Sequence, residues 1–286
     1  METLKIAVQK SGRLLDDSIQ LLKECGIKVD NGKDQLKAAA TNFPLEVLYL
    51  RNSDIPQYLA DGVADISIIG ENTLIEKEKE LVNLRKLGFS KCRLSLAVPK
   101  EVDYPGLQWF QNRKVATSYP NTVNAFFKEK GINADIHVIS GSVEIAPNIG
   151  LADGIADLVS SGSTLFKNGL KEVEVMLKSE AVLATNKNLS AGKKEILDKL
   201  LFRIDAVMAA KNNKYVLLNA PNDKIDEIIR ILPGMKSPTV MPLAASGWSS
   251  VHTVITESDF WNLFLNHIFN TTFNRYLMDR FLIRFF

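Results

Sequence analysis

Residues 154–165 have the sequence Gly-Ile-Ala-Asp-Leu-Val-Ser-Ser-Gly-Ser-Thr-Leu, which predicts a buried strand that runs into a polar loop. The strand is apolar except for the carboxylate of Asp157, as is typical of strands buried on both faces. Residues 160–164, which we name the hydroxyl loop, then offer hydroxyls and consecutive backbone N–H groups. Such groups bind phosphate oxygens, and Asp157 is well placed for sugar hydroxyls. The alternative is a plain strand-to-helix connection with Ser163 or Thr164 as the helix N-cap.

Length and composition restrict the class of protein. The chain has 286 residues, of which 46% are hydrophobic and 24% charged, so we expect a globular protein with two or three domains. A net charge of +2 argues against a nucleic-acid partner. Two cysteines cannot form a disulfide framework, residues 1–5 lack the apolar core of a signal peptide, and no apolar run is long enough to span a membrane. We therefore expect a cytoplasmic protein without a membrane partner.

A second polar loop follows the first predicted strand, residues 4–8. Lys10 and Arg13 stand at the carboxyl end of this strand, where open α/β sheets hold their ligands, and Gly12 adds an unobstructed backbone. We name residues 10–13 the basic loop. It can bind phosphate, or its two cations can simply be solvated. A helix over 14–25 follows it.

The pattern of strand, polar turn and helix recurs along the chain. Glu71 follows a buried strand over 65–70, and the charged run 76–80 is interpreted as the solvated face of the next helix. His137 lies among apolar residues and is interpreted as structural, and the three histidines are too widely spaced for a metal cluster. Further strands are predicted over 94–99, from 115, and over 136–139, 172–177 and 181–185, and a long helix over 193–211.

The pattern changes beyond residue 211. Strands over 215–219, 239–243 and 251–256, with a helix over 225–232 after the first, follow the β-α-β-β order of a ferredoxin-like module. Such a module has little room for a second active site, so we expect it to bind an effector or another subunit.

Seven segments, taken in order, resemble the long form of ATP phosphoribosyltransferase, the first enzyme of histidine biosynthesis. They are residues 9–14, 54–56, 68–72, 92–97, 116–120, 141–147 and 150–162. The resemblance implies an α/β fold with a two-lobed core like that of type II periplasmic binding proteins, and a small carboxyl-terminal ferredoxin-like (ACT-like) regulatory domain. The implied boundaries are 1–91 with 172–211 for the first catalytic lobe, 92–171 for the second, and 212–286 for the regulatory domain.

The resemblance also implies the reaction and its site. ATP and 5-phosphoribosyl 1-pyrophosphate (PRPP) would give N1-(5-phosphoribosyl)-ATP and pyrophosphate, with Mg²⁺ arriving on the pyrophosphate rather than held by the protein alone. Histidine would inhibit, and the chain would form homo-oligomers, dimers and hexamers. The implied catalytic residues are Asp157, Arg13 and Glu144, with Glu144 also a candidate partner for ribose or Mg²⁺. PRPP would contact Asp157, Ser160, Ser161, Gly162, Ser163 and Thr164. ATP and pyrophosphate would contact Lys10, Gly12, Arg13, Glu71 and Arg93. Histidine would contact Asn219, Ser237 and Thr239.

Two alternatives and one departure stand beside this hypothesis. A two-lobed core is also typical of solute-binding proteins, and a catalytically silent allosteric partner is a further possibility. From about residue 262 the chain lacks the Gly-Ala turn and the apolar strand that end the family pattern, and is rich in Phe, Leu and Asn instead. Whether this tail preserves histidine binding and hexamer assembly stays open.

Overall fold

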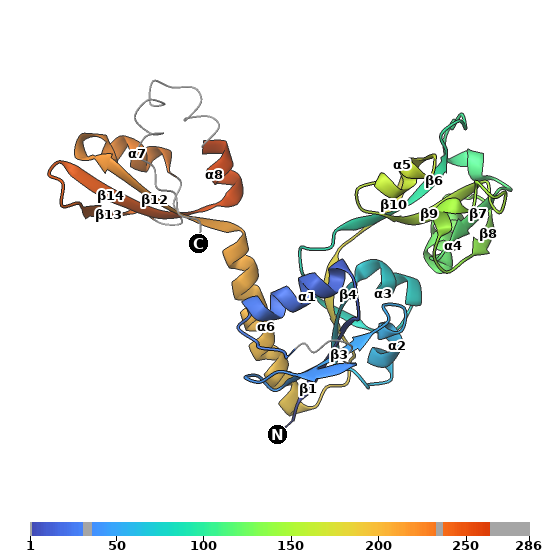
Figure 1. The fold of residues 1–286 in the computed structure, drawn as a ribbon, viewed down its shortest axis with the longest axis horizontal. Helices are drawn as coiled ribbons and strands as arrows, with labels where there is room; N and C mark the ends of the chain where they lie inside the picture. Colours follow the sequence, from blue (N-terminus) through green and yellow to red (C-terminus); the bar gives the residue numbers. More distant parts are fainter. Residues whose placement is uncertain (1, 31–35, 233–236, 264–286) are drawn as a thin grey trace. The chain divides into compact units, whose positions relative to one another are not determined.

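The computed structural model describes residues 2–30, 36–232 and 237–263. In this part of the chain the strands form three sheets (Figure 1). The backbone contacts divide the chain after Leu200 into two compact units, of which the first contains two of the sheets. We call these two sheets, with their helices, the first and the second lobe.

The first lobe has a mixed sheet whose three central strands are parallel. Its elements are β1 (Leu4–Gln9), α1 (Arg13–Glu24), β2 (Lys37–Ala39), β3 (Leu45–Leu50), α2 (Ile55–Ala60), β4 (Ile66–Gly70), α3 (Glu71–Lys77), β5 (Val82–Lys86) and β11 (Ala181–Thr185). The strand order is β2-β3-β1-β4-β11-β5, with β1 parallel to both β3 and β4. Ile55 and Leu59 of α2 pack on Ala7 and Ile69, which fixes this helix to the sheet. The carboxyl ends of β1 and β4 therefore lie at the same edge, and carry the basic loop and Glu71.

The second lobe surrounds β9. Its elements are β6 (Cys92–Pro99), η1 (Leu107–Phe110), β7 (Lys114–Thr117), α4 (Pro120–Glu129), β8 (Asp135–Val138), η2 (Val143–Ile145), β9 (Gly154–Val159), α5 (Ser163–Lys167) and β10 (Leu170–Ser179). The strand order is β10-β6-β9-β7-β8. Ile155 and Ala156 are fully buried and belong to two different core clusters, so β9 is covered on both faces. This confirms the prediction of a buried strand.

The return from the second lobe to the first differs from the expected boundary. We expected residues 172–179 in the first lobe, but β10 pairs with β6 along its length, from Leu170 opposite Pro99 to Ser179 opposite Cys92. The chain crosses back only at Glu180, between β10 and β11. The reason is that β10 is long enough to complete the edge of the second sheet before β11 enters the first.

The charged run 76–80 is not the solvated face of a continuing helix. Helix α3 ends at Lys77, and β5 begins at Val82. The side chain of Glu76 is buried, with 5% of its surface exposed, because its carboxylate accepts hydrogen bonds from the start of α4.

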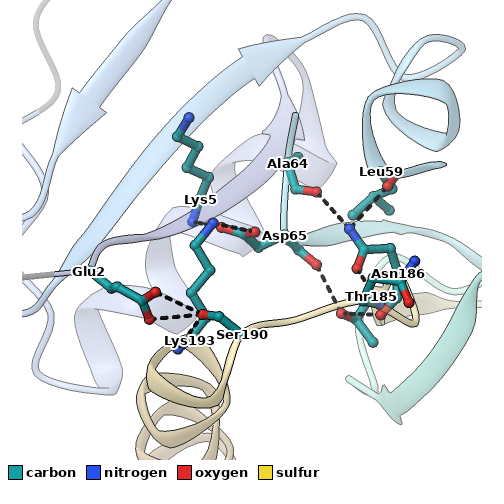
Figure 2. Close-up of polar contacts among 10 residues, drawn as sticks. Glu2, Lys5, Leu59, Ala64, Asp65, Thr185, Asn186, Ser190 and Lys193 are labelled. Carbon is teal, nitrogen blue, oxygen red and sulfur yellow. Dashed lines mark hydrogen bonds and ion pairs between the residues drawn. The ribbon is translucent and has the colours of Figure 1, made fainter. Parts of the chain in front are cut away.

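A polar cluster fastens the amino-terminal end of helix α6 (Ala191–Lys211) to the first lobe (Figure 2). The buried carboxylate of Asp65 accepts a hydrogen bond from the backbone N–H of Lys5 at 2.8 Å and forms an ion pair with the Lys193 ammonium, also at 2.8 Å. The Ser190 hydroxyl donates to the Glu2 carboxylate. Because removing one partner from a buried ion pair leaves an uncompensated charge, this cluster fixes where α6 begins.

The second unit contains the remaining sheet. Its elements beyond α6 are β12 (Asn213–Pro221), η3 (Asn222–Lys224), α7 (Ile225–Ile231), β13 (Thr239–Pro242), β14 (Trp248–Thr256) and α8 (Glu257–Leu263). The strand order is β12-β14-β13, all antiparallel, and Ile228 and Phe260 pack on one face of the sheet. This is the predicted β-α-β-β order. The tail expected to be atypical lies almost entirely outside the described residues.

Among the residues that the structure describes, no helix is both long and apolar enough to cross a membrane.

Candidate functional site

The hydroxyl loop follows β9, as predicted, and its last two residues, Ser163 and Thr164, begin α5. Gly162 has a φ of +80°, in the left-handed region that glycine adopts most easily, and it occupies the N-cap position of α5. The alternative interpretation, in which Ser163 or Thr164 is the N-cap residue, is therefore wrong, because both lie inside the helix. Their side chains and that of Ser161 are exposed, and the Ser161 hydroxyl donates to that of Ser163 at 3.0 Å. The Ser161 hydroxyl also accepts a hydrogen bond from the Ser163 N–H at 3.4 Å, and the exposed hydroxyls of the loop are accessible to an incoming group.

Asp157 lies just before this loop with its side chain half-buried. One carboxylate oxygen accepts a hydrogen bond from the Leu158 N–H at 2.8 Å. Burial raises the pKa of Asp157 to about 6, and the negative charge of Glu144 contributes to this rise. Glu144 lies in η2, half-buried, and its charge acts on Asp157 although 13 positions separate the two in sequence. The fold therefore brings two of the predicted catalytic carboxylates into one electrostatic environment.

Arg93 is held by other residues of the second lobe. Its guanidinium binds both oxygens of the Glu172 carboxylate and donates to the backbone carbonyl of Ser160 at 3.1 Å. The Ser95 hydroxyl donates to the same carboxylate at 2.7 Å. The Arg93 hydrogen bonds hold the pKa of Glu172 below its usual value. Arg93 thus supports the start of the hydroxyl loop. Glu172, which was not predicted from the sequence, orients the guanidinium of Arg93.

The basic loop lies in the first lobe, between β1 and α1. Gly12 has a φ of +86° and forms the N-cap position of α1. Lys10 is exposed, and its backbone N–H donates to the Leu50 carbonyl at 2.8 Å. The Arg13 side chain is 73% exposed, and its guanidinium lies 3.8 Å from the Asp17 carboxylate one turn along the helix. Both cations are accessible to a ligand, as either interpretation of this loop requires.

An open cavity of about 410 Å³ lies where the chain passes between the two lobes. It brings together three of the predicted residues, Glu71, Arg93 and Ser160. Glu71 forms an ion pair with the Lys86 ammonium at 3.1 Å. The remaining lining residues, which sequence reasoning missed, are Lys86, Lys91, Cys92, Lys178, Ser179 and Glu180. Four cations against two carboxylates make the cavity suited to an anion.

The other predicted residues are not in this lining. Lys10, Gly12 and Arg13 belong to the basic loop, and Asp157 and Glu144 to the carboxylate pair. The sequence signal for the missed lysines is weak, because Lys86, Lys91 and Lys178 look like ordinary surface charges. Only the fold shows that the two segments that connect the lobes, near residues 86–92 and 178–180, line the same cavity.

The residues predicted to bind histidine lie in the second unit. Asn219 pairs with Ser250, and Thr239 with His252, so both lie on the face of β14 opposite to Val251, which packs with α7 and α8. Ser237 is exposed just before β13. Asn219 and Thr239 thus share a face of the sheet.

Among the described residues, no group of three or more His, Cys, Asp or Glu side chains is arranged to hold a metal ion. Asp157 and Glu144 are two hard oxygen donors, the type that Mg²⁺ prefers, and substrate phosphates commonly complete its coordination. The residues therefore fit a metal that arrives with its substrate.

Comparisons with known proteins agree with this description. A family model described as ATP phosphoribosyltransferase matches residues 51–206, and one described as HisG, C-terminal domain, matches residues 210–266. The ATP phosphoribosyltransferase of Phocaeicola vulgatus is 60% identical over 260 residues, which are 91% of this chain and 92% of that protein. That of Cytophaga hutchinsonii is 58% identical over 260 residues, 91% of each chain.

Solved structures share the fold. The ATP phosphoribosyl transferase (HisG:HisZ) complex from Thermotoga maritima contains a chain that superposes with a TM-score of 0.63 at 29% identity, covering 72% of this chain and 99% of that one. The substrate binding protein of an amino acid ABC transporter superposes with a TM-score of 0.50 at 14% identity, covering 73% and 94%, which shows the fold alone. The expected two-lobed core and separate carboxyl-terminal domain are thus confirmed. The chain belongs to the ATP phosphoribosyltransferase family.

Proposed function

We propose that the chain condenses ATP with PRPP to give N1-(5-phosphoribosyl)-ATP and pyrophosphate, the first step of histidine biosynthesis. The observation that carries the proposal is the hydroxyl loop at the end of β9, the strand that contains Asp157, in a member of this family. A loop of hydroxyls and backbone N–H groups suits a 5-phosphate, and an adjacent carboxylate suits ribose hydroxyls.

The reaction needs alignment and charge neutralisation more than proton transfer. The lone pair on adenine N1 attacks the anomeric carbon of PRPP, the bond from that carbon to the pyrophosphate oxygen breaks, and pyrophosphate leaves with its electron pair. The configuration at the anomeric carbon inverts. No strong base is required, so two anionic substrates have to be held in line and the leaving group has to be stabilised.

Each group of residues has a role in this scheme. The hydroxyl loop would hold the 5-phosphate, with Arg93 supporting the loop through Ser160. Asp157 would orient the ribose, and as an anion it would stabilise positive charge that develops on the sugar. Lys10 and Arg13 would bind phosphates of ATP or pyrophosphate, helped by the backbone at Gly12. Glu71, as an anion, would contact a hydrogen-bond donor of ATP instead of its phosphates.

Mg²⁺ would arrive bound to pyrophosphate, where it neutralises charge on the leaving group. The carboxylates of Asp157 and Glu144 are the residues of this chain that could complete its coordination.

Regulation and assembly belong to the same proposal. Histidine would bind the carboxyl-terminal domain near Asn219, Ser237 and Thr239 and inhibit the reaction, and the chain would form dimers and hexamers. The match of residues 210–266 to the family's carboxyl-terminal domain supports this part. Cells keep ATP and PRPP in the cytoplasm, so the proposal includes a cytoplasmic location.

A direct assay tests the proposal. The purified full chain is mixed with ATP, PRPP and Mg²⁺, and phosphoribosyl-ATP and pyrophosphate are measured, with each substrate omitted in turn and with histidine added. Turnover that requires both substrates is expected, and Asp157→Asn should lower kcat by about a hundredfold while the protein stays folded. Binding of either substrate without pyrophosphate release would contradict the proposal and favour a solute-binding or silent partner protein.

A further inference from the structure

We propose that Glu76 is a positioning residue that docks the start of α4, in the second lobe, onto α3, in the first. This contact would hold the Asp157 end of β9 in a fixed position relative to the Glu71 end of β4. The inference rests on the proposed function, because it concerns how the two substrate-binding halves are kept in register.

The Glu76 carboxylate accepts hydrogen bonds from the start of α4 in the second lobe. One oxygen accepts from the Asn121 N–H at 3.0 Å, and the other accepts from the Thr122 N–H at 2.9 Å and from the Thr122 hydroxyl at 2.7 Å. In return, the Asn121 side-chain amide donates to the Glu76 carbonyl at 2.9 Å. Four hydrogen bonds therefore join α3 of the first lobe to α4 of the second lobe.

The energetics favour the docked arrangement. A buried carboxylate is costly unless it is hydrogen-bonded or paired, and the partial positive charge at a helix amino terminus compensates it. Helix α4 has Pro120 in its first turn, and the residue at its N-cap position, Tyr119, makes no side-chain cap. Glu76 thus supplies from the first lobe the cap that the local sequence lacks. Separation of the lobes here would strip both the carboxylate and the helix end of their partners.

The contact continues to the proposed site. The Asn72 side-chain amide, one turn before Glu76, donates to the Tyr119 hydroxyl at 3.2 Å. The Ser179 hydroxyl, in the cavity lining, donates to the other end of that amide at 2.8 Å. Asn72 can take this position because residue 70 is a glycine. A Cβ at Gly70 would collide with the side-chain oxygen of Asn72.

The Tyr119 hydroxyl is also influenced by charge in the second lobe. Burial raises the pKa of the Tyr119 hydroxyl, and the negative charge of Asp157 raises it further. The hydrogen bonds of Asn72 to Tyr119 and Ser179 therefore link the docked helices to the lining of the cavity.

Matched variants separate positioning from simple stability. Glu76→Gln removes the negative charge and replaces one carboxylate oxygen with an NH₂ group, which would face backbone N–H groups. Glu78→Gln is the control, because it makes the same change at an exposed residue two positions further along the chain. Thr122→Val removes one hydrogen bond without changing the shape of the side chain, and Thr122→Ser keeps the hydroxyl. The full-length variants are compared by kcat and KM for each substrate, and by hydrogen exchange of the backbone.

The expected result has two parts. Glu76→Gln should lower kcat by tenfold or more, Thr122→Val by about threefold, and Glu78→Gln and Thr122→Ser by less than twofold. Exchange at residues 121–122 and at the hydroxyl loop should become faster in Glu76→Gln, while strands β1 and β9 keep their protection. Unchanged kcat in Glu76→Gln, or faster exchange at 121–122 without any at the hydroxyl loop, would overturn the proposal.

The test remains decisive in two less favourable cases. If Glu76→Gln does not fold, the comparison of Thr122→Val with Thr122→Ser decides by the same criteria. If the wild-type chain releases no pyrophosphate, the proposed function fails, and exchange at the hydroxyl loop alone decides whether Glu76 couples the lobes.

Discussion

The guanidinium of Arg93 donates to the backbone carbonyl of Ser160 at 3.1 Å, so a side chain of β6 holds the first residue of the hydroxyl loop. The same guanidinium binds both oxygens of Glu172 on the other neighbouring strand. The loop is therefore supported by a charged pair that bridges strands, and the consequences of this support can be measured.

Arg93→Lys should raise the KM for PRPP by tenfold or more. Lysine keeps the charge but cannot bind Glu172 with two parallel hydrogen bonds and reach Ser160 as well. Steady-state kinetics over a range of PRPP concentrations would measure the change. Arg113→Lys is the matched control, because Arg113 is in the same lobe and pairs with Asp153 at 3.9 Å. Equal KM values in the two variants would contradict the supporting role of Arg93.

Gly162→Ala should raise the KM for PRPP, and the loss of thermal stability that it causes should not account for this rise. A φ of +80° is strained for alanine by about 1 kcal/mol, so the substitution should shift the hydroxyl loop. Gly169 has a φ of +70° at the other end of α5 and open space around it, which makes Gly169→Ala the control for strain. Both variants should lose similar amounts of thermal stability, and only Gly162→Ala should raise the KM for PRPP. A similar KM in both would show that the loop conformation is not important.

Arg13→Ala should raise the KM for ATP or PRPP by roughly tenfold to a hundredfold, because a hydrogen bond to a charged group contributes about 1.5 to 3 kcal/mol. The stability of the protein should hardly change, since this side chain is largely exposed. Lys23→Ala, in the last turn of the same helix, is the control. If both saturation curves stayed at the wild-type position, the basic loop would be only a solvated surface.

Asp157 should make stability depend on pH with a definite sign. Its pKa is raised from 3.8 to about 6, so the folded state holds the proton more tightly than the unfolded state. The resulting stabilisation is present below about pH 4 and is lost as the pH rises through 6, by up to about 3 kcal/mol. Asp157→Asn removes this loss, so the variant should gain stability relative to the wild type between pH 4 and pH 7. Thermal unfolding of both proteins across this range is the measurement, and a constant difference would contradict the raised pKa.

How much of this site the sequence could predict depends on the range of the interactions. The strand β9 and the hydroxyl loop depend on a local pattern, an apolar run followed by Ser, Gly and Thr, and both were predicted. The pairing of Arg93 with Glu172 could not be, because β10 shifts its register against β6 twice, between Glu172 and Glu174 and between Val175 and Leu177. No regular pairing rule brings these two residues together.

The burial of Glu76 could not be predicted either, because it also depends on residues that are distant in the sequence. Within the run of alternating charges it is indistinguishable from its solvated neighbours, because its partners lie 45 and 46 positions away in the other lobe. The available signal was at the partner, where Tyr119 and Pro120 open a helix without a capping side chain. A helix that lacks its own cap predicts that some other residue supplies one, but not which.

The strand order of the first lobe also bears on how the chain emerges from the ribosome. Strand β5 pairs with the sheet through β11, and β11 is synthesised only after residues 92–179 have been completed. The second lobe, which is one uninterrupted segment, can therefore fold while the edge of β4 is still unpaired. During synthesis, the lobe with the hydroxyl loop is in a position to become native first, and the lobe that begins the chain is finished last.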